Sequence, residues 1–166
     1  AAGAFAVGNS FKEGIPEIEE YVKVVETQDI IVEVDNQPLK IEDVYFTTSS
    51  FFSVFSYPLV AGNPMGILEE PNTAAISETI ALKIFGTKDA VGKTLPISGN
   101  RSYKITGVFA DMQMNTQLKP NFLASYKTFV NMNTDENSSP EEWWYSDGCV
   151  TYLLLDKDAD PNAVEA

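Results

Sequence analysis

The chain has 166 residues, of which 44% are hydrophobic and 21% charged, a composition typical of a globular protein with one core or two small subdomains. Its 24 acidic and 11 basic side chains give a formal net charge of −13, which disfavours binding to nucleic acid and to anionic lipid surfaces. There is no histidine and only one cysteine, Cys149, so the sequence excludes His-based catalysis, an intrachain disulfide and a Cys-cluster metal site.

The first part of the chain carries one helix signal followed by strand signals. Apolar spacing predicts a short amphipathic helix over residues 3–13, which Gly14 and Pro16 end. We then expect strands over residues 21–26 and 30–35, a turn at residues 36–38, and a third strand over residues 39–46. The apolar phase of the third strand slips at Glu42 and Asp43, which predicts a β-bulge.

Residues 48–58 combine helix-capping and aromatic side chains. Residues 48–50 are N-cap candidates for a short helix that ends before Pro58. Four aromatic side chains fall within seven residues: Phe51, Phe52, Phe55 and Tyr57. This density is typical of a core plug, and an aromatic ligand site is the alternative.

The stretch GTKDAVGKT, residues 86–94, resembles a phosphate-binding loop. In the motif G-x-x-x-x-G-K-[ST] four residues separate the glycines, whereas five separate Gly86 from Gly92 here. A phosphate-binding loop also follows a strand and opens a helix. Here the order is reversed, because a strand over residues 73–76 leads to a helix that Ser77 caps and Gly86 ends. We therefore predict no nucleotide site, with Lys93 and Thr94 facing solvent.

The rest of the chain reads mainly as β structure. Gly99 and Asn100 predict a tight hairpin between strands at 94–98 and 101–109, and Tyr103, Ile105 and Phe109 are expected to share a face of the second strand. Two further elements and a helix start follow: a strand or short helix over residues 121–129, an apolar strand over residues 149–156 buried on both faces, and a final helix beginning at Asp160-Pro161. We interpret Cys149 as a small apolar residue of that buried strand.

No residue pattern supports catalytic, metal-binding or cofactor-binding chemistry. The alternation of Asp156, Asp158 and Asp160 resembles the start of a calcium loop, but Pro161 stands where that loop needs its glycine. The candidate functional residues are instead partner contacts: Trp143, Trp144, Tyr145, Met112 and Met114. For the Trp143–Tyr145 cluster, packing against the Cys149 strand is the alternative.

Four stretches in order resemble the extracytoplasmic core domain of MacB-like and FtsX-like ABC transporter permeases, in the form common in Bacteroidetes-type bacteria. They are IPEIEEYVKV, SSFFSVFSYPLVAGNP, AAISETIALKIFGTKDAVGKTL and YKITGVFADM. The family usually has a proline soon after the aspartate of the GVFAD stretch, where this chain has Met112-Gln113-Met114.

The resemblance implies an α+β fold of two subdomains. Residues 1–67 and 147–166 would form a Porter-like α/β sandwich, truncated at its C-terminal end, and residues 68–146 a mainly β, Sabre-like insertion. Such a domain is looped out between two transmembrane helices, so a hydrophobic helix is expected before Ala1 and at least one after Ala166.

The resemblance also implies a non-enzymatic role at the periplasmic face of the bacterial inner membrane. The domain would transmit ATP-driven movement to a substrate or periplasmic partner, in efflux, export or envelope remodelling. Its implied partners are the transmembrane helices of the same permease, a cytoplasmic ATPase that holds the ATP, a second permease copy and a periplasmic adaptor. A periplasmic ligand-binding or sensor module is the alternative.

Overall fold

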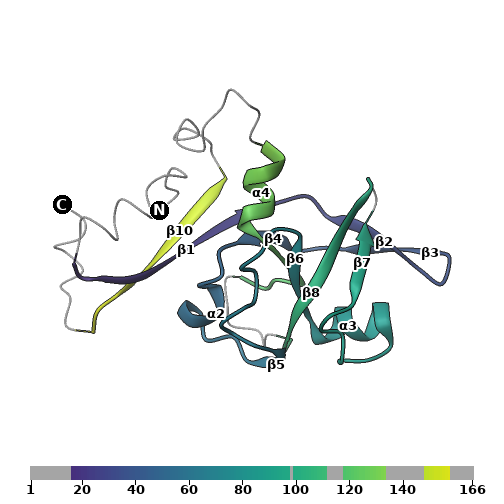
Figure 1. Cartoon of the computed structure of the whole chain (residues 1–166), viewed down its shortest axis with the longest axis horizontal. Coiled ribbons are helices and arrows are strands. Elements are labelled where there is room, and N and C mark those ends of the chain that lie inside the picture. The colour runs from purple at the N-terminus through teal and green to yellow at the C-terminus, as the bar shows by residue number, and fades with distance from the viewer. Residues whose placement is uncertain (1–15, 98, 112–117, 134–147, 158–166) are drawn as a thin grey trace.

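The structure, a computed structural model, describes residues 16–97, 99–111, 118–133 and 148–157. These residues form a mixed α/β structure with one large sheet, a separate hairpin and a few short helices (Figure 1). The predicted α+β class is therefore confirmed. The helix expected over residues 3–13 and the helix start at Asp160 lie outside the described residues.

The main sheet has eight strands. Seven follow the order β10-β1-β4-β9-β6-β8-β5, and β7 pairs with the opposite end of β8 from β5. Neighbouring strands are antiparallel except for the parallel pairs β4–β9 and β6–β8. The bounds are β1 (Ile18–Glu26), β4 (Val44–Thr47), β5 (Leu59–Gly62), β6 (Thr73–Ser77), β7 (Thr94–Ile97), β8 (Arg101–Phe109), β9 (Phe122–Ser125) and β10 (Cys149–Leu155).

A two-stranded antiparallel hairpin, β2 (Ile30–Val34) and β3 (Gln37–Ile41), projects from one end of the molecule (Figure 1). Its two turn residues, Asp35 and Asn36, both have positive φ, 50° and 61°, as a tight twisted hairpin requires. The turn predicted at residues 36–38 therefore lies earlier, and Pro38 belongs to β3 opposite Glu33.

The bulge predicted at Glu42 and Asp43 is wrong. These residues separate β3 from β4, and Asp43 turns the chain with a φ of 57°. The segment expected as one strand over residues 39–46 thus divides between the hairpin and the main sheet. The alternation of apolar residues changes phase here because the chain passes from one sheet to another, and the side chains of each strand alternate relative to their own sheet.

Three described helices flank the sheet: α2 (Phe51–Val54), α3 (Glu78–Phe85) and α4 (Tyr126–Asn133). The predicted limits of α3 are confirmed, since the Ser77 hydroxyl accepts a hydrogen bond from the Ile80 amide and Gly86 ends the helix in the left-handed conformation. The segment predicted as strand or helix over residues 121–129 contains both, β9 followed by α4.

The core lies in two clusters on opposite faces of the main sheet. Because side chains alternate along a strand, Ala74 and Ile76 join one cluster while Ala75 joins the other. The first cluster is covered by the hairpin, α3 and α4, and the second by α2 with Ile67 and Leu68. Phe51, Phe52 and Tyr57 are buried in the second cluster, so the predicted aromatic plug is confirmed.

A register shift in β8 overturns the prediction that Tyr103, Ile105 and Phe109 share one face. Between β6 and β8 the pairing passes from Ile105 directly to Gly107, so Thr106 is an extra residue in the strand. Tyr103 and Ile105 therefore belong to the first cluster and Phe109 to the second.

Strand β10 is the terminal strand of the described sheet and pairs with β1 alone among described strands. Only Cys149 is buried and the next six residues are half-buried, so the described structure does not show the burial on both faces predicted for this strand. Its partner β1 belongs to residues 1–67, which the resemblance places in the same subdomain as β10. The subdomain limits, 1–67 with 147–166 and 68–146, remain a prediction. Strands β4 and β9, one from each part, are neighbours in one sheet.

Candidate functional site

A groove of about 880 Å³ lies on the second face of the sheet, where β1, β4 and β10 meet. We call it the β1–β10 groove. Its floor is set by strand register: Val24 of β1 pairs with Val150 of β10, and Glu26 of β1 pairs with Tyr45 of β4. Paired residues of antiparallel strands project to the same face, so these side chains surround one hollow.

The wall of the groove is braced by the aromatic plug. The ring of Tyr152, which lines the groove, lies 4.9 Å from the ring of Phe55 in an edge-on arrangement. The Tyr57 hydroxyl donates a 2.7 Å hydrogen bond to the carbonyl of Leu118, a second lining residue. Because Tyr57 is itself buried, the position of Leu118 is tied to the core.

The groove is negative in character. Glu26 supplies a carboxylate, and neither lysine nor arginine is among its described lining residues. Burial raises the pKa of the Tyr45 phenol, and the negative charges of Glu26 and Asp43 raise it further. Tyr45 is therefore neutral at physiological pH, when it can donate or accept a hydrogen bond. The arrangement suits an apolar group joined to a positive charge.

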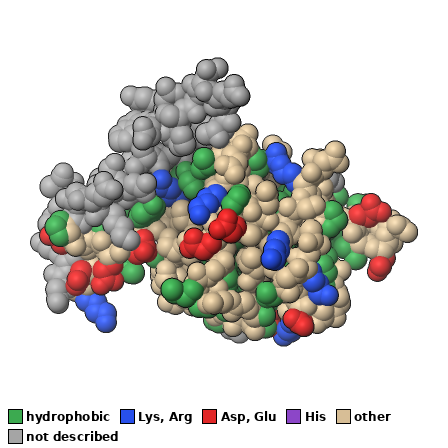
Figure 2. Space-filling model, in the orientation of Figure 1, with side chains coloured by type: hydrophobic (Ala, Val, Ile, Leu, Met, Phe, Trp, Pro, Cys, Tyr) green, Lys and Arg blue, Asp and Glu red, His purple; other side chains and the backbone are tan. Residues whose placement is uncertain are grey.

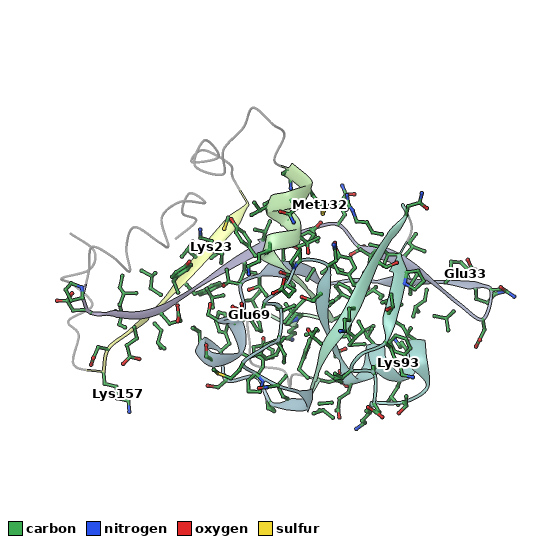
Figure 3. The ribbon with its side chains drawn as sticks, viewed as in Figure 1. Lys23, Glu33, Glu69, Lys93, Met132 and Lys157 are labelled. Atoms are coloured by element: carbon green, nitrogen blue, oxygen red, sulfur yellow. The ribbon has the colours of Figure 1, made fainter. Side chains whose placement is uncertain are left out.

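A buried lysine lies on the opposite face of β1. Lys23, labelled in Figure 3, is 7% exposed. Its ammonium nitrogen lies 5.7 Å from the ring centre of Tyr21 and 5.4 Å from that of Tyr126 of α4. Burial lowers its pKa, and the nearby Cys149 opposes that shift. The only local signal for this lysine is its place within the apolar run YVKVVE.

Cys149 is 1% exposed and faces the same side of the sheet as Lys23. Burial raises the pKa of its thiol. A buried thiol kept protonated is a weak nucleophile, so the interpretation of Cys149 as a small apolar core residue is confirmed by its burial.

Several amides of the stretch GTKDAVGKT donate hydrogen bonds within the chain. The amide of Gly92 donates to the Ile105 carbonyl at 2.8 Å, and that of Lys93 donates to the Ala90 carbonyl at 3.1 Å. Lys93 and Thr94 are exposed, as predicted, and the Lys93 ammonium lies 5.6 Å from the Phe85 ring. These bonds use the donors with which a phosphate-binding loop holds its ligand. The absence of a nucleotide site stays a prediction.

The predicted partner contacts Trp143, Trp144, Tyr145, Met112 and Met114 lie outside the described residues, as do Asp158 and Asp160. The first described residues after those two contact segments, Leu118 and Gly148, both line the β1–β10 groove. Sequence reasoning did not identify the groove itself.

Two further properties concern the part of the chain that the structure describes. No set of three or more Asp, Glu or Cys side chains there is placed to hold a metal ion. No helix there has the length and apolar character needed to cross a membrane.

The family model described as the MacB-like periplasmic core domain matches residues 3–166. A search of curated proteins returned no match. Among solved structures, a domain of a putative permease protein from Porphyromonas gingivalis is 24% identical with a TM-score of 0.78, over 98% of this chain and 73% of that one.

Two further solved structures share the fold. The periplasmic region of MacB from Actinobacillus actinomycetemcomitans is 18% identical with a TM-score of 0.71, over 98% of this chain and 69% of that one. The extracellular domain of the noncanonic ABC-type transporter YknZ from Gram-positive bacteria is 15% identical with a TM-score of 0.64, over 94% of this chain and 74% of that one.

Proposed function

The chain belongs to the MacB-like periplasmic core domain family, a periplasmic part of ABC transporter permeases, and we propose that it transmits ATP-driven movement without catalysing a reaction itself. Its location would be the periplasmic face of the bacterial inner membrane. Its task would be to pass force from the transmembrane helices of its permease to a substrate or a periplasmic partner.

The observation that carries this proposal is the continuity of the main sheet. Strands from β10 to β5 form one hydrogen-bonded unit with an apolar cluster on each face. The parallel pair β4–β9 joins segments that are far apart in the sequence. A densely packed sheet resists deformation, so force applied at β10 would move β5 with it rather than bend the domain.

The remaining parts of the proposal follow the family. A cytoplasmic ATPase, fused or separate, would bind and hydrolyse the ATP, and this domain would need no cofactor. A second permease copy would complete a dimer, and an adaptor or the substrate would bind on the periplasmic side. A non-catalytic role agrees with the state of Cys149, which lines the β1–β10 groove, because burial raises the pKa of this thiol and keeps it in its weakly nucleophilic protonated form.

The test is a pair of distance measurements in the full-length permease, reconstituted with its ATPase. In a Cys149→Ala background, spin labels at Glu33→Cys and Lys157→Cys report on one domain, because these exposed residues lie at opposite ends of it (Figure 3). A label at Glu33→Cys alone reports on the separation of two copies. An ATPase that lacks its phosphate-binding lysine is the control.

We expect ATP to change the distance between copies and to leave the distance within one domain unchanged. No change should occur with the inactive ATPase. If ATP changes only the distance within one domain, the domain does not move as a rigid unit and the proposed transmission role is wrong. The proposal is also wrong if neither distance responds to ATP.

A further inference from the structure

We propose that the β1–β10 groove binds a peptide segment in which a lysine or arginine lies two residues from an apolar side chain. This inference goes beyond the transmission role and does not depend on it, since it concerns binding by this chain alone. It commits to a peptide as the occupant for reasons of size, charge and strand geometry.

The size and floor of the groove suit several side chains. Its volume of about 880 Å³ is near the upper end of the roughly 300–1,000 Å³ typical of ligand pockets. Val24, Val150 and Leu118 provide apolar surface, and the rings of Tyr45 and Tyr152 add flat contact area. An apolar side chain placed there would lose contact with water on several sides, which is the favourable term in binding.

The charge of the groove selects a cation beside that apolar group. Glu26 is exposed and forms no ion pair with any described lysine or arginine, so it is available to a ligand. The formal net charge of −13 attracts basic ligands and repels acidic ones over longer distances. Acidic side chains also stand at both ends of the molecule, beside β1 and at the hairpin (Figure 2).

Strand geometry favours a peptide over a free amine. Cys149 and Val150, at the start of β10, line the groove, and β10 is the terminal strand of the described sheet. An extended peptide can add to such an edge through main-chain hydrogen bonds. Alternate side chains of the peptide would then point to one face, which is how an apolar and a basic group reach the groove together.

The experiment is an NMR titration of the ¹⁵N-labelled 166-residue chain. The probe is acetyl-Leu-Ala-Lys-amide, with acetyl-Leu-Ala-Glu-amide as the charge-reversed control and n-butylammonium as the free amine. We expect the lysine peptide to shift the amide signals of Glu26, Gln28 and Val150, and to bind at least fivefold more tightly than either control. Equal binding of the three probes would overturn the proposal, and so would shifts confined to other residues.

Two matched variants test the carboxylate. Glu26→Gln keeps the shape of the side chain and removes its charge, so the lysine peptide should bind about two- to fivefold more weakly, as expected for a partly exposed ion pair. Glu33→Gln removes a carboxylate from the hairpin, outside the groove lining, and should leave affinity unchanged. Equal weakening by both variants would show that only the net charge of the chain matters, and would contradict a site in the groove.

Discussion

The carboxylate of Asp111 accepts two hydrogen bonds from Thr79. One comes from the Thr79 amide at 3.2 Å and the other from its hydroxyl at 2.6 Å. Thr79 lies in the first turn of α3, where helix amides have no partner within the helix, and Asp111 follows β8. The contact therefore joins two of the stretches that identify the family, AAISETIALKIFGTKDAVGKTL and YKITGVFADM.

Removing this contact should destabilise the chain. Asp111→Ala should lower the free energy of unfolding by about 1 kcal/mol, since it leaves a helix N-terminal amide without its acceptor and removes a negative charge near the helix N-terminus. Urea unfolding followed by circular dichroism measures the change. Thr79→Ala should cost less than Asp111→Ala, and the double variant less than the sum of both. Strict additivity would show that the two residues do not interact.

Gly62 lies at a close approach of β5 to β8. A Cβ atom there would lie 2.6 Å from the Thr106 carbonyl oxygen and 2.9 Å from the Gly107 Cα, and the φ of Gly62 is +110°. Gly62→Ala should therefore destabilise the fold by roughly 2 kcal/mol or more, because backbone atoms cannot yield as a side chain would. Gly66→Ala is the matched control, with nothing within 4 Å of its Cβ, and should change stability by less than about 0.5 kcal/mol. Equal melting temperatures for both variants would contradict this close approach.

Elements set by local chemistry could be predicted from the sequence. Ser77 and Gly86 bound α3 because a hydroxyl and a left-handed glycine satisfy helix ends whatever surrounds them. Gly99 and Asn100 both have positive φ, 96° and 61°, as the predicted hairpin required. Such signals act within a few residues, so an isolated sequence contains them.

Features set by distant partners could not be predicted. The β1–β10 groove combines Val24, Tyr45 and Val150, which meet only because β1 takes β10 on one side and β4 on the other. The register shift at Thr106 likewise depends on how β6 pairs with β8. Lys23 has the local sequence of an ordinary strand residue, and its contact with the ring of Tyr126 exists only because α4 packs beside β1. Pairing of this kind is decided by packing across the whole sheet.

The stability of the chain should fall in alkali because of Tyr103. This side chain is 3% exposed and lies 5.4 Å from the ring of Phe122. Burial raises the pKa of its phenol above the ordinary value of 10.0, and the charge of Arg101 opposes that shift only in part. Because the pKa is raised in the folded state, the folded chain binds more protons above pH 10 than the unfolded chain does. The stabilising contribution of Tyr103 is therefore complete below pH 10 and is lost as the pH rises through the pKa of the folded state.

Tyr103→Phe removes this titration. Between about pH 8 and pH 11 its melting temperature should fall less than that of the unmodified chain, while at about pH 8 the two proteins should differ by less than about 1 kcal/mol. Differential scanning calorimetry at both pH values measures the effect. Parallel falls in both proteins would assign the alkaline loss to other groups.

The chain should bind no ATP, despite the likeness of GTKDAVGKT to a phosphate-binding loop. The Gly92 and Lys93 amides already donate to carbonyls, and Gly86 ends α3, so the loop faces the C-terminal end of that helix. This end carries a partial negative charge, which repels phosphate. Isothermal titration of the chain with magnesium ATP should release no saturable heat, and Lys93→Ala should behave identically. Saturable binding that Lys93→Ala abolishes would show that the loop holds a nucleotide after all, whereas binding that survives the substitution would place the nucleotide elsewhere on the chain.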